Sequence, residues 1–418
     1  MKYYINPSKE IWSEILSRPV QNFEEIEQKV QPILTNIKNK GDEALAEYVQ
    51  AFDKIDFDEV KISKSQLENA TTLLSEELKN AIQQAYQNIH KFHQAQLQKP
   101  SKIETSKGVV CWRKSVPIQK VGLYIPGGTA PLFSTVLMLG IPAQIAGCQE
   151  VIICSPSIHP AILYAANLVG VTKFFRIGGA QAIAAMAYGT ETVPKVYKIF
   201  GPGNQFVTAA KMLVCKQGMA IDMPAGPSEV AILADDSANP AFVAADLLSQ
   251  AEHGIDSQVL MVATSSKILE AIKIELESQL EKLPRKELAK KALENSSFVL
   301  IETMDTAIDF LNDYAAEHLI LAIENAELVS EKIINAGSIF LGNFTPEAAG
   351  DYASGTNHTL PTNGFAKAFS GVSLDSFVKK ITVQSISKEG IALLGPSIIT
   401  MAEAESLEAH ANAVRLRI

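Results

Sequence analysis

Residues 120–154 read KVGLYIPGGTAPLFSTVLMLGIPAQIAGCQEVIIC, and this stretch decides the fold class of the chain. An apolar run at 121–125 is followed by a glycine-proline turn, a helical stretch and a second apolar run at 151–154. That order of elements makes a crossover between parallel strands. No charge lies between Lys120 and Glu150, so the stretch could be mistaken for a membrane span, but its glycines and prolines would leave backbone groups unpaired in lipid. We therefore expect a buried α/β core and no membrane partner.

The same alternation continues along most of the chain. Helical stretches of about ten to fifteen residues separate most of the apolar runs, which favours parallel sheets covered on both faces. Nine expected strands are more than one sheet usually holds, and we therefore expect two α/β layers. The first hundred residues and the tail after Ser373 are expected to be mainly helical. Strands are expected at 121–125, 151–154, 174–178, 196–200, 230–234, 259–264, 298–301, 318–323 and 338–341, and helices at 30–40, 65–98 and 403–415.

Composition narrows the class of protein. The 418 residues include 37 Lys and Arg against 46 Asp and Glu, a net charge of −9, and 47% are hydrophobic. This describes a globular protein without the basic stripe that a nucleic-acid partner requires. The start of the chain is not that of a signal peptide, and the cysteines form no C-x-x-C pair, so we expect a reducing, cytoplasmic location. Those cysteines are Cys111, Cys148, Cys154 and Cys215.

Three glycine turns stand between an expected strand and an expected helix. They are 127–128, 178–179 and 201–204, the last reading Gly-Pro-Gly-Asn. Such a turn aims free N–H groups at one point, which suits a phosphate, and open sheets bind ligands at this edge. None of the turns completes G-x-G-x-x-G, so each could also be a tight turn and no more.

Two pairs of side chains could carry chemistry. Gln250 and His253 share a face of one helical turn, where they could bind a metal ion or simply cap the helix end. Glu317 and His318 are adjacent at the start of an apolar run. They could form a general acid–base pair or an ordinary surface pair.

The spacing along the sequence gives less support to the remaining candidate functional residues. Asp351 and His358 lie in a polar loop, which could carry function or merely connect elements. Glu405 and His410 are five residues apart and do not share a helix face, which favours two solvated side chains. Cys154 ends a strand but has no adjoining His or Asn motif, so packing is favoured over a nucleophile.

Several phrases, taken together, resemble the histidinol dehydrogenase family from the N-terminal helices to the last helix. DLLSQAEHG and SGTNHTLPT are the most specific of them. The resemblance implies oxidation of L-histidinol to L-histidine through the aldehyde, in two NAD-dependent steps that end histidine biosynthesis. The others are GLYIPGGTAPLFSTVLM, RIGGAQAIAAMAYGT, IFGPGNQFVTAAK, IDMPAGPSEVAILAD and AAEHL.

The resemblance also implies roles for particular residues. One Zn²⁺ per subunit is expected on Gln250, His253 and Asp351, with His410 supplied by the other subunit of a homodimer. Glu317 and His318 are the expected catalytic pair. The substrate is expected to contact Ser228, His358 and Glu405 as well as His318 and the four metal ligands. NAD is expected to contact Tyr124, Gln181 and Asn204.

The fold implied by the resemblance has two incomplete Rossmann-like domains, one inserted in the other, with terminal segments exchanged in the dimer. We expect an N-terminal arm at 1–20 and an inserted NAD-binding domain at 120–229. A discontinuous domain at 21–119 and 230–372 would carry the metal and the catalytic residues. Residues 373–418 would form the exchanged helical segment.

A mechanism follows as a hypothesis. The metal anchors the imidazole and amine of histidinol, His318 accepts protons in both steps, and Glu317 activates the water that hydrates the aldehyde. Mn²⁺ or Co²⁺ could replace zinc on such ligands. Two alternatives remain, a metal-independent dehydrogenase of the same scaffold and a non-catalytic nucleotide-binding protein. The four metal ligands argue against the first, and the Glu317–His318 pair argues against the second.

Overall fold

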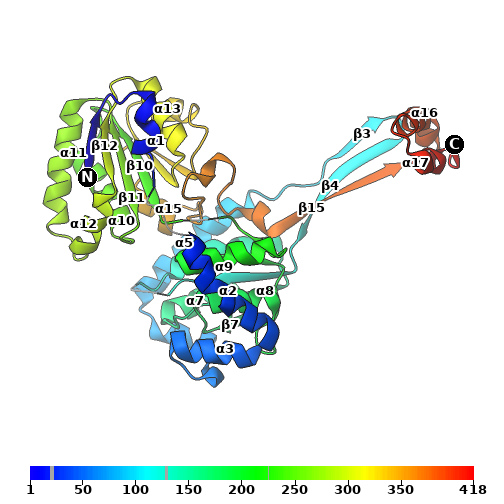
Figure 1. Cartoon of the computed structure of the whole chain (residues 1–418), viewed down its shortest axis with the longest axis horizontal. Helices are drawn as coiled ribbons and strands as arrows, with labels where there is room; N and C mark the ends of the chain where they lie inside the picture. Colours follow the sequence, from blue (N-terminus) through cyan, green and yellow to red (C-terminus); the bar gives the residue numbers. More distant parts are fainter. Residues whose placement is uncertain (19–22, 128–129, 225) are drawn as a thin grey trace.

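The computed structural model describes residues 1–18, 23–127, 130–224 and 226–418. Gly128, part of one predicted glycine turn, lies outside these residues. Over the described residues the chain forms two six-stranded sheets and one three-stranded sheet. Helices cover both faces of each large sheet, and the small sheet forms an arm that projects from the body (Figure 1). The two predicted α/β layers are therefore confirmed.

The first large sheet, which we call sheet A, contains the N-terminal strand. Its order is β1-β12-β11-β10-β13-β14, and all neighbours are parallel. Side chains alternate between two apolar layers, as strands buried on both faces require. Its strands are β1 (Lys2–Ile5), β10 (Glu229–Ala234), β11 (Gln258–Ala263), β12 (Ser297–Leu300), β13 (His318–Ala322) and β14 (Ser338–Leu341). The helices around it are α1 (Trp12–Ile15), α10 (Pro240–Ala251), α11 (Ser266–Leu280), α12 (Lys286–Glu294), α13 (Met304–Tyr314), α14 (Ala326–Ser330) and α15 (Glu347–Tyr352).

The second large sheet, sheet B, has the order β2-β7-β6-β5-β8-β9 and is parallel except for the edge strand β2. It contains the stretch that decided the fold class, because 120–154 forms β5, α6 and β6. Its strands are β2 (Lys61–Ile62), β5 (Lys120–Tyr124), β6 (Glu150–Cys154), β7 (Lys173–Phe175), β8 (Lys198–Phe200) and β9 (Ala220–Ile221). The helices around it are α2 (Phe23–Lys40), α3 (Asp42–Tyr48), α4 (Lys64–Asn69), α5 (Glu76–Gln94), α6 (Phe133–Ala146), α7 (Pro160–Leu168), α8 (Gly179–Tyr188) and α9 (Gln205–Lys216).

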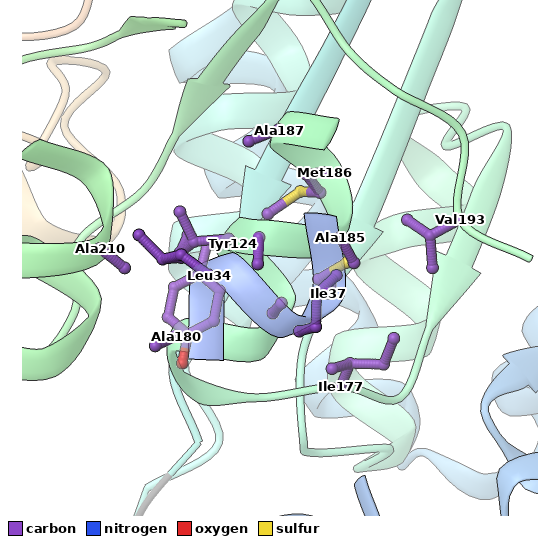
Figure 2. Close-up of a cluster of buried hydrophobic side chains, with 14 of the residues drawn as sticks. Leu34, Ile37, Tyr124, Ile177, Ala180, Ala185, Met186, Ala187, Val193 and Ala210 are labelled. Carbon is purple, nitrogen blue, oxygen red and sulfur yellow. The ribbon is translucent and has the colours of Figure 1, made fainter. Parts of the chain in front are cut away.

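The core on one face of sheet B explains why the N-terminal helices belong to it. Leu34 and Ile37 of α2 are fully buried against alanines of α8 and α9, around the ring of Tyr124 (Figure 2). Small alanine side chains let these helices approach closely, so the apolar stripe of α2 finds its partner here. The opposite face is covered by α4, α5, α6 and α7.

The two large sheets belong to nested units whose limits differ from those that the sequence analysis predicted. Sheet B and its helices are inserted between β1 and β10 of sheet A. Residues 23–94 pack on sheet B, whereas the sequence analysis grouped 21–119 with 230–372. Residues 1–18 do not form a separate arm, because β1 pairs with β12 and α1 packs on the sheet. Helical periodicity shows that a helix has an apolar face but does not show which sheet that face packs against.

The arm combines two distant segments. A hairpin of β3 (Lys102–Ser106) and β4 (Val109–Pro117) pairs antiparallel with β15 (Val378–Ile386), which leads to α16 (Lys388–Ala404) and α17 (Glu408–Arg415). At the tip, α16 packs against α17 and the chain ends, far from sheet A (Figure 1). Large apolar side chains remain exposed there, as an unpartnered helix pair leaves them. They include Leu393 at 59%, Met401 at 67% and Leu416 at 76% exposure.

Several predicted boundaries were wrong. β15 occupies part of the tail that was expected to be helical, and the predicted helix 403–415 is divided at Ser406, which has a positive φ of 59°. The predicted helix 65–98 is likewise α4, a short 3-10 turn and α5. The remaining short helices are η1 (Lys9–Ile11), η2 (Val49–Asp53), η3 (Phe57–Glu59), η4 (Ala70–Leu73), η5 (Phe365–Lys367) and η6 (Leu374–Phe377). Among the helices of the described residues, none has the length and apolarity that a membrane crossing needs.

Candidate active site

A polar cleft of about 500 Å³ lies between the two large sheets. Its volume is typical of a site for a small molecule. From sheet B it receives the loops after β5 and β8, which are at the carboxyl edge where parallel sheets usually bind ligands. From sheet A it receives the residues at the start of β10 and β13, which are at the amino edge. The cleft therefore joins opposite edges of two parallel sheets.

Glu317 and His318 meet in this cleft, and both side chains are buried. Oε2 of Glu317 lies 3.7 Å from Nδ1 of His318. The backbone N–H of Glu229 donates to the same Oε2 at 2.9 Å, and the carbonyl of Glu229 lies 3.4 Å from Nδ1 of His318. A carboxylate and an imidazole held together this closely can exchange protons with a substrate.

Glu347, which the sequence analysis did not select, completes the surroundings of His318. Its Oε1 lies 3.5 Å from His318 Nδ1, and its Oε2 is buried without a hydrogen-bond partner among the described residues. It opens α15, the helix that also carries Asp351, and Oδ1 of Asp351 lies 3.6 Å from His318 Nε2. Three carboxylates thus surround one imidazole.

The expected metal ligands of this chain also line the cleft. Gln250 and His253 lie at the end of α10, and Asp351 lies across from them on α15. Both amide atoms of Gln250 are buried and make no hydrogen bond with the described residues. In those residues no group of three or more His, Cys, Asp or Glu is arranged to hold a metal ion. Of the three expected ligands that a chain supplies to its own cleft, only His253 and Asp351 are of these residue types.

His358 ties the polar loop to sheet B. Its Nδ1 lies 2.9 Å from the carbonyl oxygen of Asp351, and its Nε2 lies 3.1 Å from the hydroxyl of Thr135 on α6. Asn357 donates to the carbonyl of Met138 on the same helix at 2.6 Å. The loop therefore belongs to the cleft and is not a free surface connection.

On the sheet B side, the turn after β8 is held rigidly. Asn204 lines the cleft while its Oδ1 accepts the N–H groups of Phe206 and Val207, which caps α9. The buried carboxylate of Asp222 accepts the N–H of Gly201 at 2.7 Å and pairs with Lys211, whose ammonium group also donates to the Gly201 carbonyl at 2.8 Å.

The other two expected NAD contacts lie in the core beside the 178–179 turn, outside the lining of the cleft. The Tyr124 hydroxyl accepts the N–H of Gly179 at 3.0 Å. Asp53 accepts the N–H of Gly178 at 3.1 Å and the side-chain N–H of Gln181 at 3.0 Å. The N–H groups of Gly178 and Gly179 are therefore already engaged within the chain.

The remaining candidates fall elsewhere. Ser228 lines the cleft directly before β10. Glu405 and His410 are exposed at the tip of the arm, outside the cleft of their own chain. Cys154 is fully buried, and burial raises the pKa of its thiol far above the ordinary range, which suits packing and not a nucleophile.

Burial and mutual charge set the electrostatics of the cleft. Burial raises the pKa of both Glu317 and Glu347 to about 8. Burial opposes charge on His318, but the carboxylates of Glu317 and Glu347 outweigh it and raise the pKa to about 10. Burial lowers the pKa of both His253 and His358. Burial therefore disfavours the ionised forms of these carboxyl groups, and a bound cation would stabilise them.

Sequence reasoning missed Glu347, Glu229, Thr135 and Asp53. Glu347 and Thr135 line the cleft from α15 and α6, while Glu229 and Asp53 act by hydrogen bonds to other site residues. Single glutamates, aspartates and threonines in ordinary helical or strand contexts carry no distinguishing pattern. Only their tertiary neighbours reveal them.

The chain has two Rossmann-like sheets with a buried carboxylate–imidazole pair in the cleft between them. An acetylating aldehyde dehydrogenase from Geobacillus thermoglucosidasius shares this fold with a TM-score of 0.51, at 14% identity over 88% of this chain and 98% of that chain. The family model described as histidinol dehydrogenase matches residues 16–418. The chain belongs to the histidinol dehydrogenase family and is an NAD-dependent dehydrogenase.

Relatives match over nearly their whole length. The histidinol dehydrogenase of Bacteroides thetaiotaomicron is 58% identical, covering 100% of this chain and 99% of the relative. That of Yersinia pestis is 51% identical over 98% of this chain and 94% of the relative. The crystal structure of histidinol dehydrogenase from Elizabethkingia anophelis superposes with a TM-score of 0.97, at 55% identity, over 100% of this chain and 98% of that chain.

Proposed function

We propose that this enzyme oxidises L-histidinol to L-histidine through L-histidinal, with two NAD molecules and a zinc ion, at the end of histidine biosynthesis in the cytoplasm. Membership of the histidinol dehydrogenase family supports the substrate. The observation that carries the proposal is the convergence of Glu317, His318, Gln250 and Asp351 on one cleft. The described cysteines are all free, which agrees with a reducing compartment.

The residues of the cleft fit a divalent cation. The Gln250 amide is buried and makes no hydrogen bond with the described residues, which costs free energy unless something binds it. Its oxygen is a suitable metal ligand. Three carboxyl groups also lie within 4 Å of the His318 imidazole, and carboxylate oxygens are suitable ligands for such a cation. We infer that Gln250, His253 and Asp351 bind zinc together with His410 of the partner subunit. The cation would supply an anchor for the imidazole and amine nitrogens of histidinol.

In the first step, the alcohol must lose a proton and a hydride. His318 accepts the hydroxyl proton while the hydride leaves the same carbon for the nicotinamide of NAD, giving the aldehyde and NADH. Glu229 and Glu347 hold the imidazole from its Nδ1 side, and Nε2 lies on the side of Asp351, one of the proposed metal ligands. Asn204 and its turn form the wall against which the nicotinamide would bind.

In the second step, water adds to the aldehyde carbon before a second hydride can leave. Glu317 takes a proton from that water as its oxygen bonds to carbon, the former carbonyl oxygen receives the proton that His318 took in the first step, and the product is a diol. His318 then removes a diol proton as the second hydride passes to a second NAD, which yields the carboxylic acid. This acid releases its proton to water and leaves the carboxylate of histidine. Each histidinol therefore produces two NADH, and four electrons are transferred.

The proposed homodimer gives the arm its role. Glu405 and His410 lie at the tip of an arm that carries exposed apolar side chains and projects away from its own cleft. We propose that the arm reaches the cleft of a second copy, where Glu405 of the partner subunit contacts substrate and His410 of the partner subunit completes the metal site. A shared site of this kind explains why the chain keeps these groups so far from its own cleft.

An absorbance assay tests the proposal. Purified protein with L-histidinol and NAD should yield two NADH per histidinol, a chelator should abolish the reaction, and added Zn²⁺ should restore it. Activity that persists after complete metal removal would contradict the zinc requirement. An absence of NADH with L-histidinol under all metal conditions would overturn the proposed function.

A further inference from the structure

A buried arginine–glutamate pair lies behind the candidate catalytic residues. Nε and Nη2 of Arg18 donate to Oε2 and Oε1 of Glu229 at 2.6 and 2.8 Å. Nη2 also donates to the carbonyl of Tyr314 at 2.7 Å, and the guanidinium lies 4.2 Å from the centre of the Tyr314 ring. The Glu229 side chain is 2% exposed and that of Arg18 is 17% exposed. This bidentate contact fixes the orientation of the Glu229 carboxylate and also neutralises its charge.

The backbone of Glu229 faces the catalytic pair from the other side. Its N–H donates to the Glu317 carboxylate at 2.9 Å, and its carbonyl lies 3.4 Å from Nδ1 of His318. One residue therefore has its side chain held by Arg18 and its peptide groups in contact with both Glu317 and His318. A movement of this residue would displace the catalytic carboxylate.

A second set of contacts ties the same point to the N-terminal segment. The Tyr314 hydroxyl donates to Gln258 at 2.8 Å and lies 3.4 Å from Glu229 Oε2. Gln258 in turn donates to the carbonyl of Ser17 at 3.1 Å. The segment that ends at Arg18 is thus anchored at two places, and it brings its guanidinium group to the start of β10.

We propose that Arg18 is a positioning residue for the reaction: through Glu229 it holds the Glu317 carboxylate in place for activation of water. The inference rests on the proposed function, because it takes water activation in the second step as the task of Glu317. Aldehyde oxidation depends on Arg18 more than alcohol oxidation does, since only aldehyde oxidation uses the Glu317 carboxylate to activate water.

The experiment compares Arg18→Lys with Arg18→Met. Lysine keeps a positive charge beside Glu229 but cannot form both bonds of the guanidinium, whereas methionine leaves a buried carboxylate unpaired. Oxidation of L-histidinal and the first NADH released from L-histidinol are measured separately, each with kcat and KM. Arg176→Met, which removes an arginine paired with Glu59 on sheet B, is the matched control. Thermal unfolding shows whether each variant is folded.

Arg18→Lys should lower kcat for L-histidinal about 10-fold and Arg18→Met about 100-fold, with KM for NAD changed less than about 2-fold. The first half-reaction should fall by a smaller factor, and Arg176→Met should leave both half-reactions unchanged. Equal losses in the two half-reactions, or an L-histidinal rate within about 2-fold of wild type in folded Arg18→Lys, would overturn the inference. Wild-type protein that makes no NADH from L-histidinol would instead overturn the proposed function.

Discussion

Glu317 and His318 turn adjacent side chains into the same cleft, with Oε2 of Glu317 3.7 Å from Nδ1 of His318. Successive residues of a strand point to opposite faces, so this arrangement requires Glu317 to lie outside the strand. Glu317 occupies a bend, and β13 begins only at His318. The N–H of Glu229 holds the carboxylate in that position. The two side chains thus meet because β13 begins between them and because the neighbouring strand β10 donates a hydrogen bond to the Glu317 carboxylate.

Substitutions of His318 and of Glu317 should affect the two half-reactions differently. His318→Asn removes the proposed proton acceptor of both steps and should lower the rates of both about 10²–10⁴-fold. Glu317→Gln keeps the shape but cannot take a proton from water, so L-histidinal oxidation should fall by that factor while L-histidinol oxidation falls less. The measurements are NADH release and accumulation of L-histidinal, with the exposed Glu324→Gln as control. Equal losses for Glu317→Gln would refute the division of roles.

Gln250→Leu should weaken metal binding while it stabilises the metal-free protein. Leucine replaces a buried amide without hydrogen-bond partners among the described residues, so the metal-free variant should be more stable by about 1–3 kcal/mol. If the proposed site binds Zn²⁺, added Zn²⁺ should raise the Tm of the wild type by mass action, and the variant should lose this rise. Metal analysis and thermal unfolding with and without Zn²⁺ make the test. Gln279→Leu, which removes an amide that donates to Ala241, should lower Tm slightly and keep the Zn²⁺ effect.

Mixed dimers test whether the arm completes the site of a second copy. His410→Asn and Asp351→Asn should each inactivate a homodimer. Co-expression of the two variants should restore about a quarter of wild-type activity, because half of the dimers are mixed and each mixed dimer has one intact site. Activity is measured on the purified mixture. If each site uses only its own chain, co-expression will restore nothing.

Gly201→Ala should damage the turn that faces the cleft. Gly201 has a φ of +126°, and a Cβ there would lie 2.1 Å from the carbonyl oxygen of Tyr124. We expect the KM for NAD to rise about 10-fold or more as the turn shifts, together with a loss of stability of about 1–3 kcal/mol or more. Gly147→Ala is the control, since Gly147 also has a positive φ but has nothing within 4 Å of a Cβ. Titration with NAD and urea unfolding should distinguish the two, and equal effects would contradict the steric argument.

His93 should make stability depend on pH below neutrality. Burial lowers the pKa of this fully buried imidazole below the ordinary 6.5, against the weaker effect of Gln96. The unfolded chain therefore binds the proton first as pH falls, so stability is present above about pH 6.5 and declines below it. His93→Gln should flatten that decline relative to wild type in urea unfolding at several pH values. His90→Gln, one turn earlier on α5 and only partly buried, should keep it, and an unchanged slope in His93→Gln would be contrary to expectation.

Local patterns in the sequence predicted the elements but not their assignment to a domain. The alternation around β5, α6 and β6 was enough to establish parallel sheets, because periodicity records which faces of an element are apolar. The same evidence misassigned α2, whose buried Leu34 and Ile37 contact α8 and α9 of sheet B. It also missed β15, where one face of the arm is solvated and the strand pattern is weak.

For the candidate site, the sequence by itself determined the chemical types that are available: the Glu317–His318 pair, the Gln250–His253 turn and the polar loop of Asp351. Only the tertiary structure decided that these groups share one cleft, that Glu347 joins them, and that Glu229 is held by Arg18. The physical reason is distance along the chain. Helical and strand periods couple residues a few positions apart, whereas a cleft between opposite edges of two sheets is created by packing that no local pattern encodes.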